Sequence, residues 1–320
     1  MNPKAASESR AGVDLTNLDQ PLFDGADATK RQLVDYLDAV ADRILPVLAD
    51  RPLSVIRIRP GQPAFMQKNV PAYTPEWVWT TTVWAAASHR EVHYALCNDR
   101  RTLLWFGNQR AVEYHPTLFL AGSTHPSHLV LDLDPPAGGP FRAVIDTARL
   151  VRQALSDAGL AGAVKTSGSK GLHIFVPLPD AVDVQDAAAA TRAIAARAER
   201  LDQTIATTAY LLQHRAGKVF VDSTRSGGGT VAAAYSPRVR PGTPVSFPLG
   251  WDQLDDVAPG DFTLRTAVGL LGDQDPWREL MPSARPLPND LLAEGREIPI
   301  ARVQAMHEGK RRARARRQRG

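Results

Sequence analysis

The chain has 320 residues, of which 43% are hydrophobic and 22% are charged, and this composition is typical of a globular protein. No segment approaches the roughly 18 consecutive apolar residues that cross a membrane, and the polar first ten residues lack the apolar core of a secretory signal. Cys97 is the single cysteine, which excludes an intramolecular disulfide and a cysteine metal cluster. We therefore expect a cytoplasmic protein that does not bind a membrane.

The net charge of +4 is unevenly distributed along the chain. Residues 301–320 hold eight Lys and Arg residues, including Arg311 and Arg312, against the single acid Glu308. This segment therefore carries +7, and the preceding 300 residues carry −3. Clustered basic side chains attract polyanions, because they replace the counterions of phosphate groups. We expect Arg311 and Arg312 to bind nucleic acid, although a solvated tail without a specific partner fits the same composition.

The hydrophobic pattern of the first third predicts mixed α and β structure. We expect a disordered segment at residues 1–12 and a helix at 29–48. Strands are expected at 55–59, 78–85 and 93–96. The apolar run at 103–106 fits either a strand or the start of a buried helix.

The middle of the chain has the clearest alternation of apolar and polar residues. Strands are expected at residues 128–134, 172–176 and 218–222. Helices are expected between them, at 141–158 and 184–205. Residues 286–320 are predicted to form a polar extension that ends in the basic tail.

Asp132 and Asp134 stand at the end of the first of these strands. Side chains two residues apart in a strand share one face, so both carboxylates project the same way. Adjacent like charges are unfavourable unless a positive charge lies between them, and oxygen ligands suit Mg²⁺ and Mn²⁺. The alternative is that one carboxylate caps the following helix and the other is solvated.

Asp222 stands in the same kind of position, after the apolar residues 219–221 and before a glycine-rich turn. Three carboxylates delivered by strand ends can hold two metal ions about 3.5–4 Å apart, the arrangement that serves in-line phosphoryl displacement. A turn-forming Asp after a strand remains the plain interpretation of this residue.

The loop from Lys165 to His173 lies between these acidic positions and reads KTSGSKGLH. Its glycines let backbone amides approach an anion, while Ser167 and Lys170 add a hydroxyl donor and a positive charge. The loop is not a Walker A motif, and it fits either a phosphate site or a polar turn. His173 can donate to a phosphate or serve as a structural residue, and Arg238 can bind phosphate or form a surface ion pair.

Four ordered segments together resemble the polymerase domain of bacterial ligase D, a group within the archaeo-eukaryotic primase superfamily. They read LVLDLDPP, KTSGSKGLHIFVPL, RAGKVFVDSTRS and AAAYSPRVRPGTPVSFPLGWDQL. The resemblance extends from about Leu15 to Trp251. It implies an α+β, archaeo-eukaryotic primase-like fold, in which an RRM-like catalytic sheet and a second, smaller α/β subdomain surround one cleft. We expect this catalytic domain to span residues 13–285.

The resemblance also implies a chemistry. The acidic residues Asp132, Asp134 and Asp222 match the family's ligands for two Mn²⁺ or Mg²⁺ ions. The positions that match its contacts to the incoming NTP or dNTP are Ser167, Lys170, His173, His115 and Arg238. The implied activity is metal-dependent, template-directed nucleotidyl transfer in DNA repair, by short-gap filling or end joining with a preference for ribonucleotides.

The resemblance further implies partners. DNA with gaps, primer-template junctions or broken ends is the expected nucleic acid, together with a DNA end-binding protein and a separate ligase. We expect a monomer associated with the nucleoid.

Two departures from the family pattern concern DNA contacts. Gln20 stands in the segment NLDQ, where relatives that grip a 5′-phosphate commonly have lysine, while Lys30 matches the second lysine of that pocket. The segment that stacks on the template commonly has two aromatic residues after Pro-Ala, and here it has Phe65 and Met66. We expect Phe65 to stack on a base and Met66 to pack against one.

Two other functions use similar residues. A glycosyltransferase can hold a nucleotide sugar through Mn²⁺ on an Asp-x-Asp pair, but it has no need of the basic tail. A catalytically silent nucleic-acid-binding module gains nothing from clustered negative charge that faces phosphates.

Overall fold

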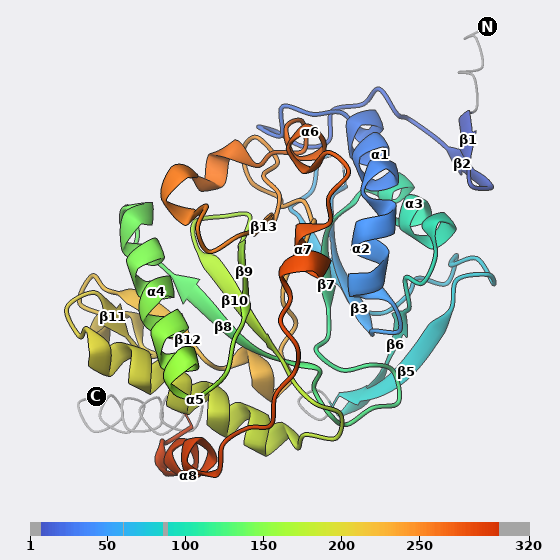
Figure 1. The fold of residues 1–320 in the computed structure, drawn as a ribbon. Helices are drawn as coiled ribbons and strands as arrows, with labels where there is room; N and C mark the ends of the chain where they lie inside the picture. The colour runs from blue at the N-terminus through green and yellow to red at the C-terminus, as the bar shows by residue number, and fades with distance from the viewer. Residues whose placement is uncertain (1–7, 60, 86–88, 301–320) are drawn as a thin grey trace, which may run out of the picture. The chain divides into compact units, whose positions relative to one another are not determined.

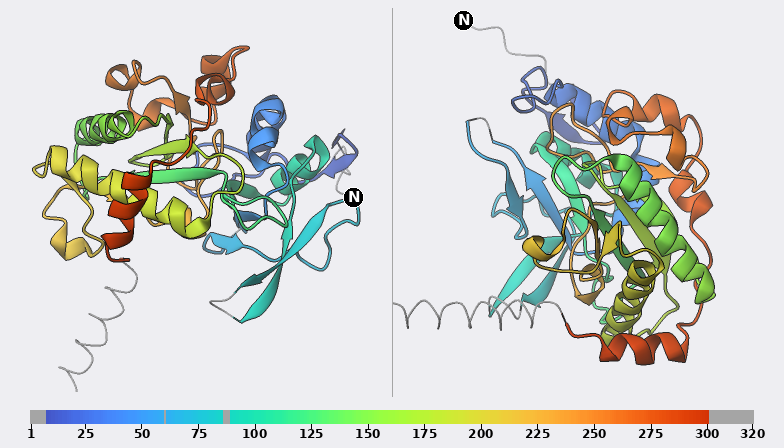
Figure 2. Two further views of the ribbon diagram at one scale, coloured as in Figure 1. Left: turned by 60° about the horizontal axis from the view of Figure 1, so that its bottom comes forward. Right: turned by 90° about the vertical axis from the view of Figure 1, so that its left-hand side faces the viewer.

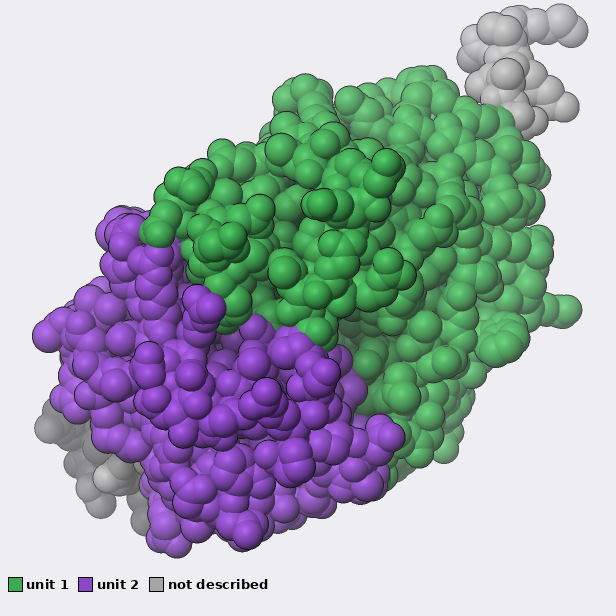
Figure 3. Space-filling view, viewed as in Figure 1, with its two compact units in different colours: residues 1–124, 163–170, 230–281 green, residues 125–162, 171–229, 282–320 purple. Residues whose placement is uncertain are grey.

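The computed structural model describes residues 8–59, 61–85 and 89–300. The chain divides into two compact units, each built from separate segments, as the colours of Figure 3 show. Unit 1 comprises residues 1–124, 163–170 and 230–281, and unit 2 comprises residues 125–162, 171–229 and 282–320. Both contain helices and strands, so the predicted α+β class is confirmed.

Figure 1 shows the elements along the chain. The strands of unit 1 are β1 (Glu8–Arg10), β2 (Val13–Leu15), β3 (Leu53–Arg57), β4 (Phe65–Gln67), β5 (Thr80–Ala85), β6 (Arg90–Ala95), β7 (Ala111–Pro116), β9 (Ala163–Thr166) and β13 (Pro248–Leu249). Its helices are α1 (Lys30–Ala39), α2 (Ala41–Leu48), α3 (Arg100–Asn108), α6 (Ala267–Leu271) and α7 (Pro276–Leu280), with the 3₁₀ turns η3 (Leu254–Asp256) and η4 (Pro259–Asp261).

Unit 2 is built around a smaller set of elements. Its strands are β8 (His128–Asp134), β10 (Leu172–Pro177), β11 (Ala206–Thr207) and β12 (Val219–Asp222). Its helices are α4 (Phe141–Asp157), α5 (Val184–Leu201) and α8 (Asn289–Glu297), with the 3₁₀ turns η1 (Leu212–His214) and η2 (Arg225–Gly227).

The main sheet of unit 1 centres on β3, which pairs antiparallel with β4, β6 and β7. The β3–β7 register brings Ser54 opposite His115 and Ile56 opposite Glu113, so the polar residues of β7 are held by a continuous ladder. In Figure 2 the β5–β6 hairpin is cyan, and β5 is largely exposed along its length. Strand β9 pairs antiparallel with β13, with Lys165 opposite Pro248.

Helix α1 begins as the sequence predicts. Thr29 accepts a hydrogen bond from the backbone of Gln32, and the Gln32 side chain accepts one from the Thr29 backbone, which satisfies two of the free amides at the helix start. The predicted single helix is wrong in its length, because α1 ends at Ala39, with Val40 as its C-cap, and α2 starts anew at Ala41. The apolar stripe continues through this break and therefore did not reveal it.

Strand β8 lies at the centre of the unit 2 sheet, whose order is β11-β12-β8-β10 within this unit. Both neighbours of β8 run antiparallel to it. Helices α4 and α5 pack against each other and against β8, and they bury Leu129, Leu131 and Leu133. Because successive side chains of a strand point to opposite faces, the polar residues of β8 lie on the other face.

Helix α8 lies against α5, as Figures 1 and 2 show. A Cβ atom on Gly295 would lie 1.9 Å from the carbonyl oxygen of Ala189, so only glycine permits this approach. Arg192 donates to the Gly295 carbonyl, and Arg197 pairs with Glu294 at 2.7 Å. The predicted polar extension therefore begins, in part, as a packed helix.

The start of the chain also differs from the prediction. Residues 8–10 form β1, which pairs antiparallel with β2, so the expected disorder of residues 1–12 is wrong for this part. Arg10 explains the order, because its guanidinium lies 2.6 Å from Asp35 and 2.5 Å from Glu8. Within the described ranges, no helix has the length and apolar character required to cross a bilayer.

Candidate active site

Three acidic residues of unit 2 share one face of its sheet. The register sets Asp132 of β8 opposite Asp222 of β12 on one side and opposite His173 of β10 on the other. Asp134 lies two residues further along β8 and therefore on the same face. The register thus sets all three carboxylates on one face of the sheet.

Arg225 and His173 occupy the oxygens of Asp132. Arg225 donates to Asp132 Oδ2 at 3.1 Å, and His173 Nε2 lies 3.2 Å from Asp132 Oδ1. The guanidinium also approaches Asp222, with 3.5 Å between Nε and Oδ2. As these side chains stand, the described part of the chain contains no group of three or more His, Cys, Asp or Glu residues placed to hold a metal ion.

The chemistry of this face nevertheless fits a divalent cation. Burial, followed by the negative charges of Asp132 and Asp222, raises the pKa of Asp134 to about 6, although Arg225 opposes the shift. The part of this increase that comes from Asp132 and Asp222 reflects repulsion between carboxylates, which a divalent cation would relieve. Carboxylate oxygens are the ligands that Mg²⁺ and Mn²⁺ prefer.

A second polar cluster lies within unit 1 and is organised by Glu113. This carboxylate is buried on β7 and accepts hydrogen bonds from His115 Nε2 at 2.8 Å and from Arg238 Nε at 2.9 Å. It also accepts from the Val239 amide at 2.8 Å. Arg238 donates in addition to the carbonyl of Ser167. Three predicted nucleotide-binding residues, His115, Arg238 and Ser167, are thus connected through one unpredicted carboxylate.

The protonation states of this cluster are set by the same contacts. Burial opposes ionisation of Glu113, but the hydrogen bond from His115, the charge of Arg238 and the Val239 amide outweigh it and lower the pKa to about 2. Burial lowers the pKa of His115 in spite of the neighbouring carboxylate. His115 is therefore a neutral donor to an ionised Glu113 at neutral pH.

The loop after β9 is held close to the segment that carries Arg238. A Cβ on Gly168, whose φ is +68°, would lie 2.5 Å from Arg238 Cγ and 2.9 Å from the Ser246 amide. Lys165 is fully buried, and its ammonium donates to Ser246 Oγ at 2.5 Å. Lys170, by contrast, is exposed at the end of the loop, where an anion can reach it.

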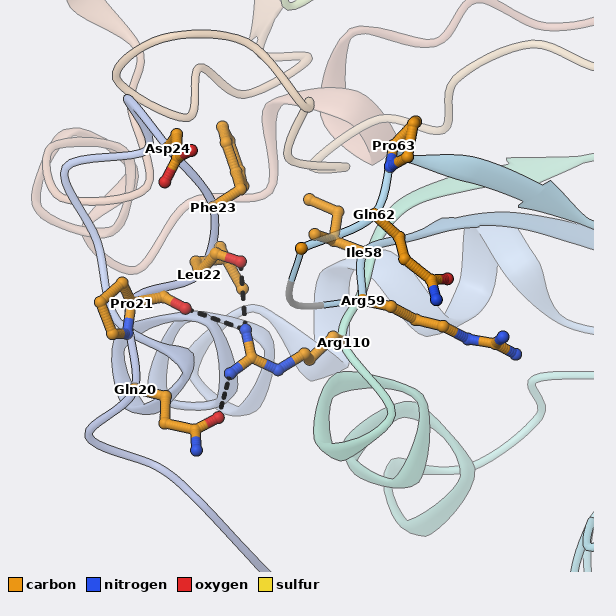
Figure 4. Close-up of a pocket in the computed structure, with 11 residues that line it drawn as sticks. Gln20, Pro21, Leu22, Phe23, Asp24, Ile58, Arg59, Gln62, Pro63 and Arg110 are labelled. Atoms are coloured by element: carbon orange, nitrogen blue, oxygen red, sulfur yellow. Dashed lines mark hydrogen bonds between the residues drawn. The ribbon is translucent and has the colours of Figure 1, made fainter.

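Gln20 lines a pocket of about 610 Å³ in unit 1, which Figure 4 shows. Arg110 donates to Gln20 Oε1 at 2.7 Å and to the carbonyls of Pro21 and Leu22, so its guanidinium is committed to the chain. Arg59 is an exposed cation at the same pocket.

Lys30 is buried rather than presented to solvent. Its ammonium donates to the Thr16 carbonyl at 2.5 Å and to Asn108 Oδ1 at 2.6 Å. Burial and the charge of Arg110 lower its pKa to about 8. A phosphate contact by Lys30 stays a prediction, and it requires the ammonium to exchange these partners.

The two residues expected to contact the template lie on β4. The guanidinium carbon of Arg59 lies 4.8 Å from the centre of the Phe65 ring, so a cation covers this aromatic face. Met66 is 46% exposed. Arg311 and Arg312 fall outside the described residues.

Sequence reasoning missed three residues of these clusters, Arg225, Glu113 and Lys165. Arg225 follows Asp222 by three residues, and an arginine so close to an acidic strand end was a usable signal. Glu113 and Lys165 gave none, because their partners Arg238 and Ser246 are far away in sequence.

Comparison with known proteins agrees with this description. A family model described as LigD, primase-polymerase domain, matches residues 29–277. The chain is 37% identical over 268 residues to the multifunctional non-homologous end joining DNA repair protein LigD of Mycobacterium tuberculosis. This match covers 79% of this chain and 34% of that protein. It is 31% identical over 267 residues to the bifunctional non-homologous end joining protein LigD of Bacillus subtilis. That match covers 82% of this chain and 43% of the Bacillus protein. The chain thus spans about a third to two fifths of these curated relatives.

A solved structure gives the same result for the fold. The polymerase domain from Mycobacterium tuberculosis ligase D, in complex with DNA, matches with a TM-score of 0.78 and 32% identity. The match covers 84% of this chain and 97% of that one, and it confirms the predicted archaeo-eukaryotic primase-like fold. The chain belongs to the family of LigD primase-polymerase domains.

Proposed function

We propose that this chain catalyses metal-dependent, template-directed transfer of nucleotides to a nucleic-acid end during DNA repair. The observation that carries the proposal is the common face of Asp132, Asp134 and Asp222, which the register of β8 and β12 fixes. Nucleotidyl transfer needs such a face, because its transition state develops negative charge on phosphate and on the attacking and leaving oxygens.

The three carboxylates are proposed to hold two divalent ions, Mn²⁺ or Mg²⁺. When bound, such ions lower the pKa of the attacking hydroxyl and stabilise the leaving pyrophosphate. The donor set supports this role, because it consists of carboxylate oxygens whose like charges repel one another. His173, on the same face, is in position to hold a carboxylate or to donate to a phosphate oxygen.

The cluster around Glu113 is proposed to bind the incoming nucleoside triphosphate. Arg238 offers a planar fork that suits phosphate oxygens, and Lys170 offers an exposed positive charge. Ser167 lies on the glycine-containing loop, where backbone amides can approach an anion. His115 is neutral and gives its Nε2–H to Glu113, so its Nδ1 is suited to accept from a sugar hydroxyl.

The cellular role is proposed to be short-gap filling or end joining, with a preference for ribonucleotides. Two observations support it: the relatives are named as non-homologous end joining proteins, and the similar solved domain is a complex with DNA. A DNA end-binding protein and a ligase are the proposed partners. We assign catalysis to residues 13–285 and DNA attachment to the basic residues 301–320.

The direct test is primer extension. The full chain is incubated with a labelled primer on short-gapped DNA, Mn²⁺ or Mg²⁺, and each NTP or dNTP. We expect templated extension that is abolished in Asp132→Ala/Asp134→Ala and retained in Asp157→Ala, which removes an exposed carboxylate of α4. Failure of the wild-type chain to extend any primer with either metal would overturn the proposal.

One observation favours a second candidate, a binding module without catalysis. The oxygens of Asp132 are occupied by Arg225 and His173 in this structure. A silent module would retard gapped DNA, extend nothing, and be unaffected by Asp132→Ala/Asp134→Ala or by added metal. The same experiment therefore distinguishes the two functions.

A further inference from the structure

Arg225 lies between two of the carboxylates and has no role in the proposed reaction. Its Nη2 lies 3.1 Å from Asp132 Oδ2, and its Nε lies 3.5 Å from Asp222 Oδ2. Within the described residues, this buried Nε has no hydrogen-bond partner. The side chain thus makes one good hydrogen bond and one long ion pair, a geometry that leaves part of its bonding capacity unused.

The backbone that carries Arg225 is firmly held. Ser226, the next residue, is fully buried, and its hydroxyl oxygen accepts from the Val130 amide at 3.0 Å. The Thr191 hydroxyl of α5 lies 2.9 Å from the same oxygen. The side chain of Arg225 is nevertheless 38% exposed. The guanidinium can therefore leave the carboxylates toward solvent without any change in the backbone.

Competition follows from the positions of these atoms. The two oxygens nearest to the guanidinium, Asp132 Oδ2 and Asp222 Oδ2, belong to the carboxylates proposed to hold the metal ions. A guanidinium and a divalent cation both need to lie in the plane of a carboxylate within about 2–3 Å of its oxygens. A cation bound to these oxygens takes up lone pairs that the guanidinium faces and repels its positive charge, so the two compete for the same carboxylates.

We propose that Arg225 is an internal counter-ion, which neutralises Asp132 and Asp222 in the metal-free chain and is displaced when a divalent cation binds. The inference rests on the metal site of the proposed function. It explains how a face with three carboxylates stays folded without metal, and why no metal-binding group is preformed among the described residues. It also makes metal binding weaker than the carboxylates alone would allow.

Mn²⁺ binding measures this competition directly. The full chain is titrated with Mn²⁺, without nucleotide or DNA, and free Mn²⁺ is followed by its electron paramagnetic resonance signal. Arg225→Gln removes the charge and retains a polar side chain of similar reach. We expect it to bind Mn²⁺ about fivefold more tightly than the wild type, since a partly exposed ion pair need not be broken. Its melting temperature in EDTA should be lower than that of the wild type, and Mn²⁺ should raise it more.

Arg215→Gln is the matched control. Arg215 is a cation of the same unit whose charge also favours ionisation of Asp134, but its guanidinium stacks on Phe220 at 3.8 Å and donates to the Ala209 carbonyl. We expect its Mn²⁺ affinity to stay within about twofold of the wild type. Equal gains in both variants would mean a general charge effect and would overturn the proposal, as would unchanged or weaker binding by Arg225→Gln.

Two further measurements keep the result interpretable. If Asp132→Ala/Asp134→Ala binds Mn²⁺ as the wild type does, the metal site of the proposed function fails and this inference fails with it. If that variant loses Mn²⁺ while Arg225→Gln is unchanged, only the counter-ion is wrong. In the wild type, the Nε–H resonance of Arg225, assigned with Arg225→Lys, should shift on addition of Mg²⁺. An unmoved resonance at saturating Mg²⁺ would contradict displacement even if Arg225→Gln did not fold.

Discussion

Arg238 donates through Nε to Glu113 Oε2 at 2.9 Å, and this contact joins residues 125 positions apart in the sequence. The same carboxylate oxygen accepts from His115, so one buried group sets the direction of both side chains proposed to contact the nucleotide. Glu113 touches no reacting atom in the proposed function, and we therefore regard it as a positioning residue.

Substitution of Glu113 should act mainly on nucleotide affinity. Glu113→Ala removes all three acceptor contacts, so we expect KM for the nucleotide to rise about tenfold, with kcat within about threefold of the wild type. Glu113→Gln retains one side-chain oxygen and should give a smaller increase in KM. Steady-state primer extension at varied nucleotide concentration measures both constants. A loss of kcat with unchanged KM in both variants would show that Glu113 does not act through nucleotide binding.

The same residue predicts a pH dependence of stability. The pKa of Glu113 is lowered from 4.5 to about 2, so the unfolded chain binds its proton more readily than the folded chain. Its contribution, on the order of 3 kcal/mol, is fully present above about pH 4.5 and is lost as the pH falls toward 2. Denaturant unfolding of the wild type and Glu113→Ala at pH 7, 5 and 3 should show the stability difference shrinking in acid. A difference that stays constant over this range would contradict the assigned contacts.

The fold and the acidic face were largely predictable, for a local reason. Alternation along 128–134 fixes which side chains share a face, and apolar runs before a polar turn mark the ends of strands. The register that sets Asp132 opposite both Asp222 and His173 was not predictable, because it depends on pairing between distant strands. The contact between Glu113 and Arg238 is hidden for the same reason.

Some local features also escaped sequence analysis. Strand β9 is short and lies next to a glycine-containing loop, so its apolar residues gave too weak a pattern. The apolar run at 103–106 fitted either a strand or a helix, and it lies in helix α3. Asp99 caps this helix by accepting a hydrogen bond from the Thr102 amide at 2.7 Å.

Gly171 is predicted to be essential for the pairing of β8 with β10. A Cβ at this position would lie 2.0 Å from the carbonyl oxygen of Leu133, in a backbone that cannot give way without breaking the ladder. Gly171→Ala should destabilise the protein by about 3 kcal/mol, the upper range for overpacking. Thermal or urea unfolding measures the loss. Gly269→Ala, in α6 with no heavy atom within 4 Å of the added carbon, should be neutral or slightly stabilising. Equal stability of the two variants would contradict the close approach.

Cys97 is predicted to be inert in the native protein. The thiol is fully buried, and burial together with the charge of Asp99 raises its pKa far above the ordinary value, so almost no reactive thiolate exists at neutral pH. An aromatic disulfide reagent should label no thiol in buffer and one thiol per chain in denaturant. Rapid labelling of the native protein would show that the segment around Cys97 opens readily.

Removal of residues 301–320 should weaken DNA binding and reduce its dependence on salt. This segment carries +7, and each phosphate contact that it makes adds about 0.9 to the slope of log affinity against log salt concentration. Affinities for gapped DNA are to be measured between 50 and 200 mM salt, roughly the range over which counterion release dominates. The controls are the full chain and Arg311→Gln/Arg312→Gln, which should lose a smaller part of the slope. If the chain truncated after Ile300 keeps both the affinity and the slope of the full chain, the tail does not contact DNA. Binding must then come from residues within the two units.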